Sequence, residues 1–243
     1  MRIKALLIMG IIVLFIFLIY LSTMDKKVYY LALGDSLALG KTPYGNIDYG
    51  YTDYIKDYLT EKNLLEKCVN NYADNDYRIT DLIRDIIDNK KITINNKEQT
   101  LKNALIKADL ITLSIGLNDL LYKLNSSFSS DREIYNHIDE MMVDMEQLFK
   151  LLKEYCKEDI MVLGYYSSIL YLKNIDTNKY IKYANEKLKV LCDNYSIHYI
   201  EIDSIFKNNS KFLPNPLDTH PSKLGYEAIA NEFIKKIDKT LLK

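Results

Sequence analysis

The sequence is poor in the residues from which most metal and redox sites are built. Only three histidines and three cysteines occur among 243 residues. A metallophosphoesterase needs several His and Asp ligands for each metal, so three scattered histidines exclude that class and the sequence predicts no metal or other cofactor. The cysteines, Cys68, Cys156 and Cys192, are odd in number and lack the spacing of a metal site. We therefore expect buried free thiols rather than a disulfide.

An excess of charge is also missing. The chain has 32 Lys and Arg against 33 Asp and Glu, for a net charge of −1, and this balance indicates no nucleic-acid partner. Repeats, low-complexity stretches and a second domain boundary are absent as well. We expect one domain over residues 26–243, which is long enough to bury a core of its own.

A single long apolar run stands near the N-terminus, where residues 5–21 follow Arg2 and Lys4. This run of seventeen residues is near the minimum length of a membrane-spanning helix, and it is longer than the apolar core of most signal peptides. Positive charge before the run favours a cytoplasmic N-terminus and an exported domain. Because no small-x-small cleavage site follows, we expect residues 1–25 to be an uncleaved transmembrane signal anchor, with the domain on the extracellular side of the cell membrane. A cleaved signal peptide and a secreted domain are the alternative.

Beyond this segment, apolar strand-like runs alternate with helical patterns. Strands are expected near residues 28–33, 67–72, 109–115, 160–165 and 197–202. Helices are expected near residues 51–63, 78–89, 98–107, 133–155, 176–193 and 221–239. This alternation predicts a three-layer α/β/α sandwich with a five-stranded parallel sheet in flavodoxin-like order. The methionine-rich stripe of the helix at 133–155 is expected to face the core rather than a lipid.

Two of the expected strands end in short polar motifs. Residues 28–33 lead into Gly-Asp-Ser-Leu at 34–37, and residues 109–115 lead into Gly-Leu-Asn-Asp at 116–119. Open parallel sheets place reactive groups at the carboxyl ends of their strands. Residues 34–42 also end in Gly-Lys-Thr, but five residues separate the two glycines where a phosphate-binding P-loop has four, and Pro43 follows where its helix should continue. This excludes a nucleotide-binding P-loop.

A third polar block, Asp-Thr-His-Pro at 218–221, lies near the C-terminus. It supplies the base that a serine hydroxyl needs before it becomes a good nucleophile. Of the three histidines, His137 falls within an expected helix and His198 within an expected strand, whereas His220 falls in a loop that contains two prolines. Pro221 after it suits the first position of a helix. We therefore expect His220 to act as the base for Ser36.

These three blocks, in this order, resemble the SGNH (GDSL-type) esterase and lipase family over about residue 28 to residue 239. The resemblance implies the SGNH hydrolase fold and a serine-dependent hydrolysis of acyl esters. It also implies an aspartate that orients the histidine, usually three residues before it. That position is Leu217 here, and Asp218 is two residues before. Asp218 is the expected orienting group, with a backbone carbonyl in a Ser–His dyad as the alternative.

The resemblance further implies three donors to the oxyanion. They are the Ser36 backbone N–H, the Asn118 side-chain amide and a backbone N–H from a glycine in the block over residues 70–80, where Asp76 stands at the expected position. Aspartate tolerates left-handed backbone better than most residues, but its carboxylate would repel an oxyanion unless it turns away. Asp35 is expected to serve structure by bonding nearby amides.

Short acyl esters, acetylated wall sugars and lysolipids all fit such an exported enzyme as small-molecule or lipid substrates. Two alternatives stay open from the sequence. One is a catalytically degenerate member of the family that binds acylated cell-envelope components, and the other is an acyltransferase, which shares the chemistry but passes the acyl group to an acceptor other than water. The loop at residues 40–50 is either part of the cleft rim or an ordinary connection.

Overall fold

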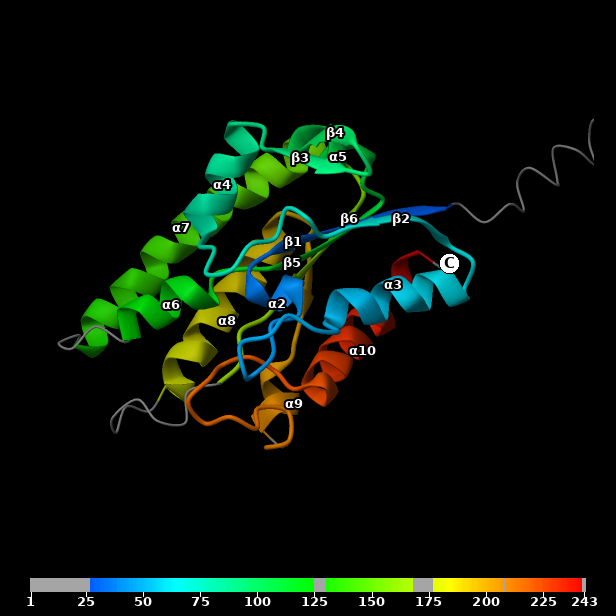
Figure 1. Ribbon diagram of the computed structural model, residues 1–243. Coiled ribbons are helices and arrows are strands. Elements are labelled where there is room, and N and C mark those ends of the chain that lie inside the picture. Colours follow the sequence, from blue (N-terminus) through cyan, green and yellow to red (C-terminus); the bar gives the residue numbers. More distant parts are fainter. Residues whose placement is uncertain (1–26, 125–129, 168–176, 208, 242–243) are drawn as a thin grey trace, which may run out of the picture.

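The structure is a computed structural model that describes residues 27–124, 130–167, 177–207 and 209–241. These residues form a main sheet with helices on both of its faces and a separate two-stranded hairpin (Figure 1). The predicted membrane anchor at residues 1–25 lies outside the described residues. None of the described helices combines the length and the apolarity that crossing a bilayer requires.

The main sheet contains five parallel strands in the order β2-β1-β5-β6-β7. Their bounds are β1 Val28–Gly34, β2 Leu65–Val69, β5 Leu110–Ser114, β6 Asp159–Leu163 and β7 His198–Ile200. Numbered among themselves, the strands have the order 2-1-3-4-5, which is the flavodoxin-like order. The prediction of a five-stranded parallel sheet is confirmed, with strand ends that differ from the expected ones by at most three residues.

All six predicted helices are present. Their bounds are α3 Tyr51–Glu61, α4 Ile79–Ile87, α5 Leu101–Lys107, α7 Asp131–Tyr155, α8 Asn178–Asn194 and α10 Lys223–Thr240. Helices α3 and α10 pack against each other on one side of the sheet, and α7 packs against α4, α5 and α8 on the other (Figure 1). The helices that alternate with the strands thus form the outer layers of the sandwich.

An antiparallel hairpin, β3 (Lys91–Ile94) and β4 (Lys97–Thr100), was not predicted. Its two-residue turn consists of Asn95 and Asn96, with φ angles of 50° and 60°. Asparagine tolerates this left-handed backbone, and two such residues form the turn that suits the twist of a hairpin. The prediction of a helix from residue 98 is therefore wrong for its first three residues.

Three short helices were also not predicted, namely α2 (Ser36–Leu39), α6 (Leu117–Leu124) and α9 (Asp203–Lys207). Each begins within three residues of the end of a strand. Helices α2 and α6 carry Ser36 and Asn118, so the two residues lie in first helical turns rather than in open loops.

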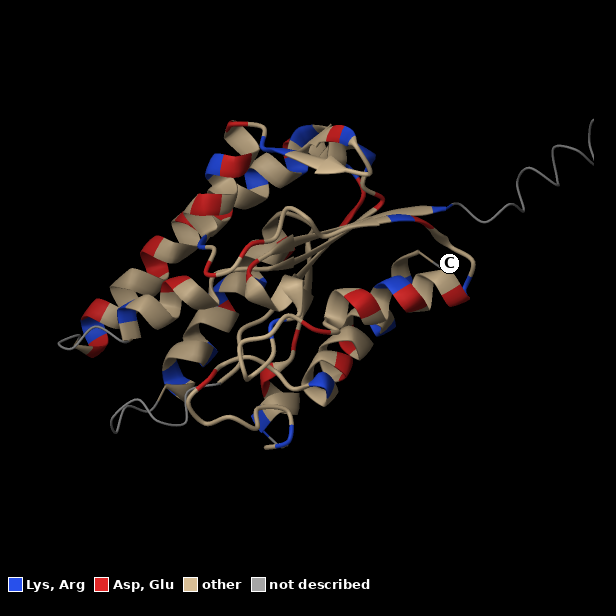
Figure 2. Ribbon diagram, viewed as in Figure 1, with Lys and Arg blue, Asp and Glu red and all other residues tan. Residues whose placement is uncertain are grey.

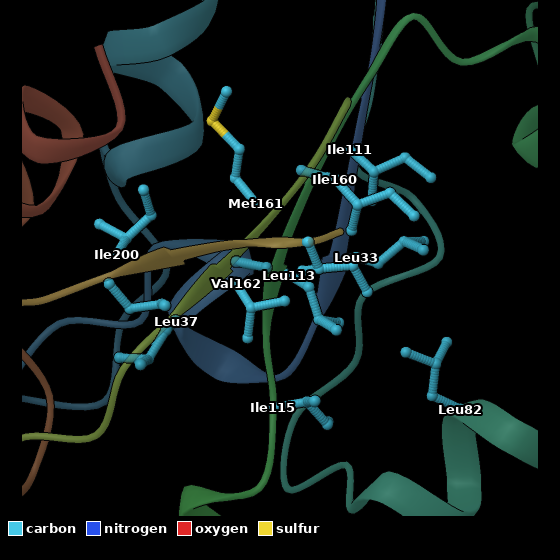
Figure 3. Close-up of a cluster of buried hydrophobic side chains, with 14 of the residues drawn as sticks. Leu33, Leu37, Leu82, Ile111, Leu113, Ile115, Ile160, Met161, Val162 and Ile200 are labelled. Atoms are coloured by element: carbon cyan, nitrogen blue, oxygen red, sulfur yellow. The ribbon is translucent and has the colours of Figure 1, made fainter. Parts of the chain in front are cut away.

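The core gathers around the middle strands. Figure 3 shows Leu33 of β1, Ile111 and Leu113 of β5, and Ile160 and Val162 of β6 side by side, and all five are buried. Helix α7 contributes its expected apolar stripe to the core, including its three methionines. The three cysteines are free, with Cys156 and Cys192 buried and Cys68 half-buried on β2, as the prediction of free thiols required.

Candidate active site

The turn between β1 and α2 presents Ser36. Gly34 has a φ of 132°, and a Cβ at this position would lie 2.0 Å from the backbone oxygen of Ser114 on β5. Any larger residue would force the two strands apart. Asp35 donates its backbone N–H to the same Ser114 oxygen at 3.0 Å. The chain can therefore turn sharply at the end of β1 while it stays against β5.

Asp35 is the N-cap of α2. Its Oδ1 accepts the backbone N–H of Leu37 at 3.0 Å and the Ser114 hydroxyl at 3.3 Å. The Ser114 hydroxyl in turn accepts from the Tyr51 hydroxyl at 3.3 Å. Burial of the Asp35 carboxyl raises its pKa to about 7. This buried chain of hydrogen bonds fixes the first turn of α2, as expected for a structural Asp35, and Ser36 takes the first helical position, whose N–H has no acceptor within the helix.

Ser36, His220 and Asp218 form one chain of hydrogen bonds. The Nε2 atom of His220 lies 2.8 Å from the Ser36 Oγ, and its Nδ1 lies 2.6 Å from the Asp218 Oδ1. The exposed fraction of the side chain is 13% for His220 and 28% for Asp218, so water reaches the outer end of the chain more easily. This arrangement can take a proton from the serine and hold the resulting imidazolium.

The loop that carries His220 is fixed at several points. Asp218 Oδ1 also accepts the backbone N–H of His220 at 2.7 Å, and the Tyr166 hydroxyl donates to the Thr219 oxygen at 2.9 Å. The Asn215 amide donates to the Pro43 oxygen at 2.7 Å. This last bond joins the histidine loop to the loop at residues 40–50 and favours its interpretation as part of the cleft rim.

Pro221 does not open the following helix. Helix α10 begins two residues later at Lys223, and Ser222 is its N-cap, with its Oγ accepting the backbone N–H of Gly225 at 3.2 Å. The expected helix start at 221 was therefore wrong. A serine hydroxyl can accept an unpaired N–H at a helix start, whereas proline offers no such acceptor. Pro221 instead stiffens the link between the histidine and that cap.

Asn118 lies in the first turn of α6, at the carboxyl end of β5 and next to the strand that leads to Ser36. Its side-chain amide donates to the Tyr77 oxygen at 2.9 Å, and the neighbouring Asp119 accepts the backbone N–H of Ile79 at 3.3 Å. Burial raises the pKa of the Asp119 carboxyl to about 6. Both residues tie α6 to the start of α4, and a primary amide has a second N–H besides the one used here.

Asp76 lies in the loop between β2 and α4. Its φ of 57° is in the left-handed region, as expected for a residue that replaces glycine, and its side chain is exposed. Two residues earlier, Asp74 donates its backbone N–H to the Gly34 oxygen at 3.2 Å. The loop thus contacts the turn that carries Ser36. The role of the Asp76 N–H stays a prediction.

The other two histidines have partners of their own. The Nε2 atom of His137 lies 3.0 Å from the Asp119 backbone oxygen, and that of His198 lies 2.9 Å from the Asp159 Oδ1. Sequence reasoning missed two residues that support the site, Ser114 and Tyr166. A serine near the end of the mostly apolar run at residues 110–115 was the available signal for Ser114, whereas nothing local distinguishes Tyr166 from the other tyrosines.

The sequence matches a known protein family over most of its length. The model of the GDSL-like lipase/acylhydrolase family matches residues 30–233, which is most of the chain and includes Ser36, Asn118 and His220. The chain belongs to this family. As a GDSL-like acylhydrolase it is a carboxylic ester hydrolase, which confirms the predicted family and enzyme class.

Solved structures share the fold of this GDSL-like acylhydrolase. The lipase Lip_vut3 from a goat rumen metagenome is 21% identical with a TM-score of 0.67, over 85% of this chain and 95% of that one. Axe2, an acetylxylan esterase from Geobacillus stearothermophilus, is 18% identical with a TM-score of 0.65, over 88% of this chain and 95% of that one. No curated protein matches the sequence closely enough to count as a relative.

Proposed function

We propose that this GDSL-like acylhydrolase uses Ser36 as its nucleophile, His220 as its general base and acid, and Asp218 as the group that orients the histidine. The observation that carries the proposal is the continuous hydrogen-bond chain from Asp218 Oδ1 through the His220 ring to Ser36 Oγ. Structures described as catalytic mutants of Axe2 replace a serine, a histidine and an aspartate, which supports the same division of roles here.

In the proposed reaction, Ser36 Oγ attacks the ester carbonyl carbon while its proton passes to His220 Nε2. The tetrahedral intermediate then expels the alcohol, which takes that proton, and leaves an acyl group on Ser36. Water attacks the acyl-serine with His220 again accepting the proton, so that the carboxylic acid leaves and Ser36 regains its hydrogen. Asp218 keeps the proton of His220 on Nδ1 and stabilises the imidazolium in both halves.

The negative oxygen of each tetrahedral intermediate needs donors. The Ser36 backbone N–H stands at the first position of α2, and the Asn118 amide has one N–H besides the bond to Tyr77. The Asp76 backbone N–H is the third proposed donor, and the Asp76 side chain is exposed to solvent. Loss of a single donor of this kind typically costs about 2.7–4 kcal/mol of transition-state stabilisation.

The purified full-length chain in mild detergent should hydrolyse p-nitrophenyl acetate, and the Ser36→Ala variant should lose this activity by at least about a thousandfold. His220→Ala should be nearly as severe. Circular dichroism with thermal melting checks that both variants stay folded, and Ser204→Ala, at an exposed serine outside the cleft, serves as the matched control. Hydrolysis that persists in folded Ser36→Ala protein would contradict the mechanism. A fluorophosphonate probe should label the unmodified chain and the Ser204→Ala control but not Ser36→Ala, and a chain that only binds its ligand would not be labelled.

We further propose that residues 1–25 anchor the domain on the outside of the cell membrane, since Arg2 and Lys4 precede the apolar run. Protease added to intact, wall-stripped cells should then digest the domain, and cell lysis should add little further digestion. A cytoplasmic protein that resists protease in the same cells is the control. Complete protection of the domain would contradict this orientation, and mature protein in the medium would favour a cleaved signal peptide.

A further inference from the structure

A small hollow lies beside Ser36 at the carboxyl ends of β1, β5 and β6. Its walls include Asp35 and Leu37, which flank Ser36, together with Leu117, Tyr165 and Tyr166. Its volume is about 10 Å³, which is about the space that one water molecule needs. The hollow can therefore accept one small group and no extended chain.

The proposed reaction assigns this hollow to the acyl side of the ester. The leaving alcohol must lie beside His220, because Nε2 gives it a proton, and the carbonyl oxygen must face the donors at Ser36 and Asn118. The carbonyl carbon carries one more substituent, the rest of the acyl group, and this must point away from both His220 and the oxyanion donors. Ser36, Asn118 and His220 do not themselves line the hollow. Both neighbours of Ser36 and Leu117, the neighbour of Asn118, do line it, whereas no neighbour of His220 does.

Tyr165 forms a fixed wall of the hollow. The Asn185 side chain on α8 bonds both backbone groups of Tyr165, because its Oδ1 accepts the Tyr165 N–H at 2.8 Å and its Nδ2 donates to the Tyr165 oxygen at 2.8 Å. The tip of the ring lies on Gly116, where an added Cβ would come within 2.5 Å of the Tyr165 hydroxyl. Tyr165 as a whole is 3% exposed, so its ring has little room to swing aside.

The Tyr165 hydroxyl is also unusual, since it is buried and finds no hydrogen-bond partner within the described part of the chain. Burial, followed by the charge of Asp119, raises its pKa, so it remains a neutral hydroxyl at any working pH. The hydroxyl lies against Gly116, which does not line the hollow, so the wall that limits the acyl group is the ring itself.

We infer that this acylhydrolase selects acetyl esters and that Tyr165 is the residue that sets the limit on acyl length, by filling the acyl side of the cleft. The inference rests on the proposed function and adds the acyl group to it. It excludes long-chain lipids as good substrates and favours acetylated compounds.

The unmodified full-length chain tests the limit directly, with p-nitrophenyl acetate, butyrate and hexanoate as substrates. Each extra methylene that a pocket rejects typically lowers kcat/KM tenfold or more, so we expect acetate to exceed hexanoate by at least about a hundredfold. A hexanoate value equal to or above the acetate value would overturn the inference.

Variants test the role of Tyr165. In Tyr165→Leu and Tyr165→Ala the ratio of hexanoate to acetate kcat/KM should rise at least about tenfold, because the ring no longer fills the hollow. Tyr165→Phe, which keeps the ring, is the matched control and should stay within about threefold of the unmodified ratio. A folded Tyr165→Leu variant with an unchanged ratio would overturn the assignment, even if the alanine variant fails to fold.

The proposed function and the limit on acyl length would fail with different results. If no ester in the series is hydrolysed in a Ser36-dependent manner, the proposed function itself is wrong. If Ser36-dependent hydrolysis is present but tolerates hexanoate, the proposed function stands and the inference about Tyr165 is wrong.

Discussion

Asp218 makes two hydrogen bonds in the loop that precedes α10, one that holds the backbone and one that orients the His220 ring. Its Oδ1 accepts from the His220 backbone and also contacts the His220 ring, at 2.7 and 2.6 Å. An aspartate that bonds the backbone N–H two residues on makes a tight Asx-type turn. A spacing of two residues thus brings the carboxylate back to the ring, although the family resemblance implies a spacing of three.

Asp218→Asn should separate the structural role of Asp218 in the turn from its electrostatic role beside the His220 ring. The amide oxygen can still accept the His220 N–H, so the turn is kept, while the negative charge beside the imidazolium is lost. We expect kcat for p-nitrophenyl acetate to fall by about 10²- to 10⁴-fold, with a melting temperature near that of the unmodified chain.

Asp218→Ala, which also removes the turn bond, is the comparison for that experiment. It should show the same loss of kcat together with a lower melting temperature. A kcat for Asp218→Asn within threefold of the unmodified value would mean that Ser36 and His220 act as a dyad and that Asp218 only shapes the loop.

Asp35 predicts a pH dependence of stability. Its pKa is raised from 3.8 to about 7 in the folded chain, so between pH 4 and 7 the folded state holds a proton that the unfolded state has released. The unfolded state therefore binds fewer protons in this window, and the free energy of unfolding falls as pH rises through it, by up to a few kcal/mol. Above pH 7 this contribution is constant.

Asp35→Asn should remove this term and keep the helix cap, because asparagine caps helices as well as aspartate does. Chemical denaturation at several pH values between 4 and 8 measures the effect. The variant should gain stability relative to the unmodified chain as pH rises from 4 to 7. A difference between the two that does not change with pH would show that Asp35 has an ordinary pKa.

At the scale of elements, the crossing from β1 to α2 depends on Gly34. A methyl group there would meet the Ser114 oxygen of the neighbouring strand, and its φ of 132° is itself strained for an L-residue. Gly34→Ala should therefore lower the free energy of unfolding by more than about 3 kcal/mol and reduce activity, because Ser36 moves with the strand end.

Gly45 provides the matched control for that substitution. It also has a left-handed φ, of 87°, but an added Cβ would contact nothing within 4 Å. Gly45→Ala should cost only the backbone strain, about 1–2 kcal/mol. Urea denaturation of both variants measures the difference, and equal losses would contradict the close approach of β1 to β5.

Sequence patterns predicted the strands and helices whose apolar residues recur at a regular spacing. They missed the hairpin and the short helices, which depend on single residues. The apolar runs of β1 and β5 and the stripe of α7 are long enough to define a strand or helix without tertiary information. The turn at Asn95-Asn96 depends on two positive φ angles, and the short helices α2 and α6 depend on caps and strand ends. Boundaries of such pieces are set by local hydrogen bonds, which a hydrophobic pattern does not contain.

The site divides in the same way. Ser36 and His220 follow from motif and order, because few serines stand at a strand end and only one histidine falls in a loop. The contact of Asp218 with the ring, and the wall that Tyr165 forms, depend on how the histidine loop and the end of β6 meet in space. No spacing in the sequence encodes that meeting.

At the scale of the whole molecule, charge is spread rather than concentrated. Figure 2 shows acidic and basic residues interspersed along the outer helices, with the strands of the sheet almost free of them. Such a mixed surface has no single-sign patch that would direct it to a polyanion. The proposed placement of the domain outside the cell membrane therefore rests on the segment before it and not on its own surface.

The direction of β1 determines on which side of the domain Ser36 lies relative to the N-terminal segment. The chain enters the domain at Lys27, at the amino end of the sheet, and arrives at Ser36 only after the seven residues of β1, which span about 23 Å. The entry point and Ser36 thus lie at opposite ends of β1 (Figure 1). A domain tethered through the proposed anchor would hold its cleft on the side that faces away from the bilayer. Acyl groups on polymers beyond the membrane would then come within reach of Ser36, and the lipids beneath the domain would not.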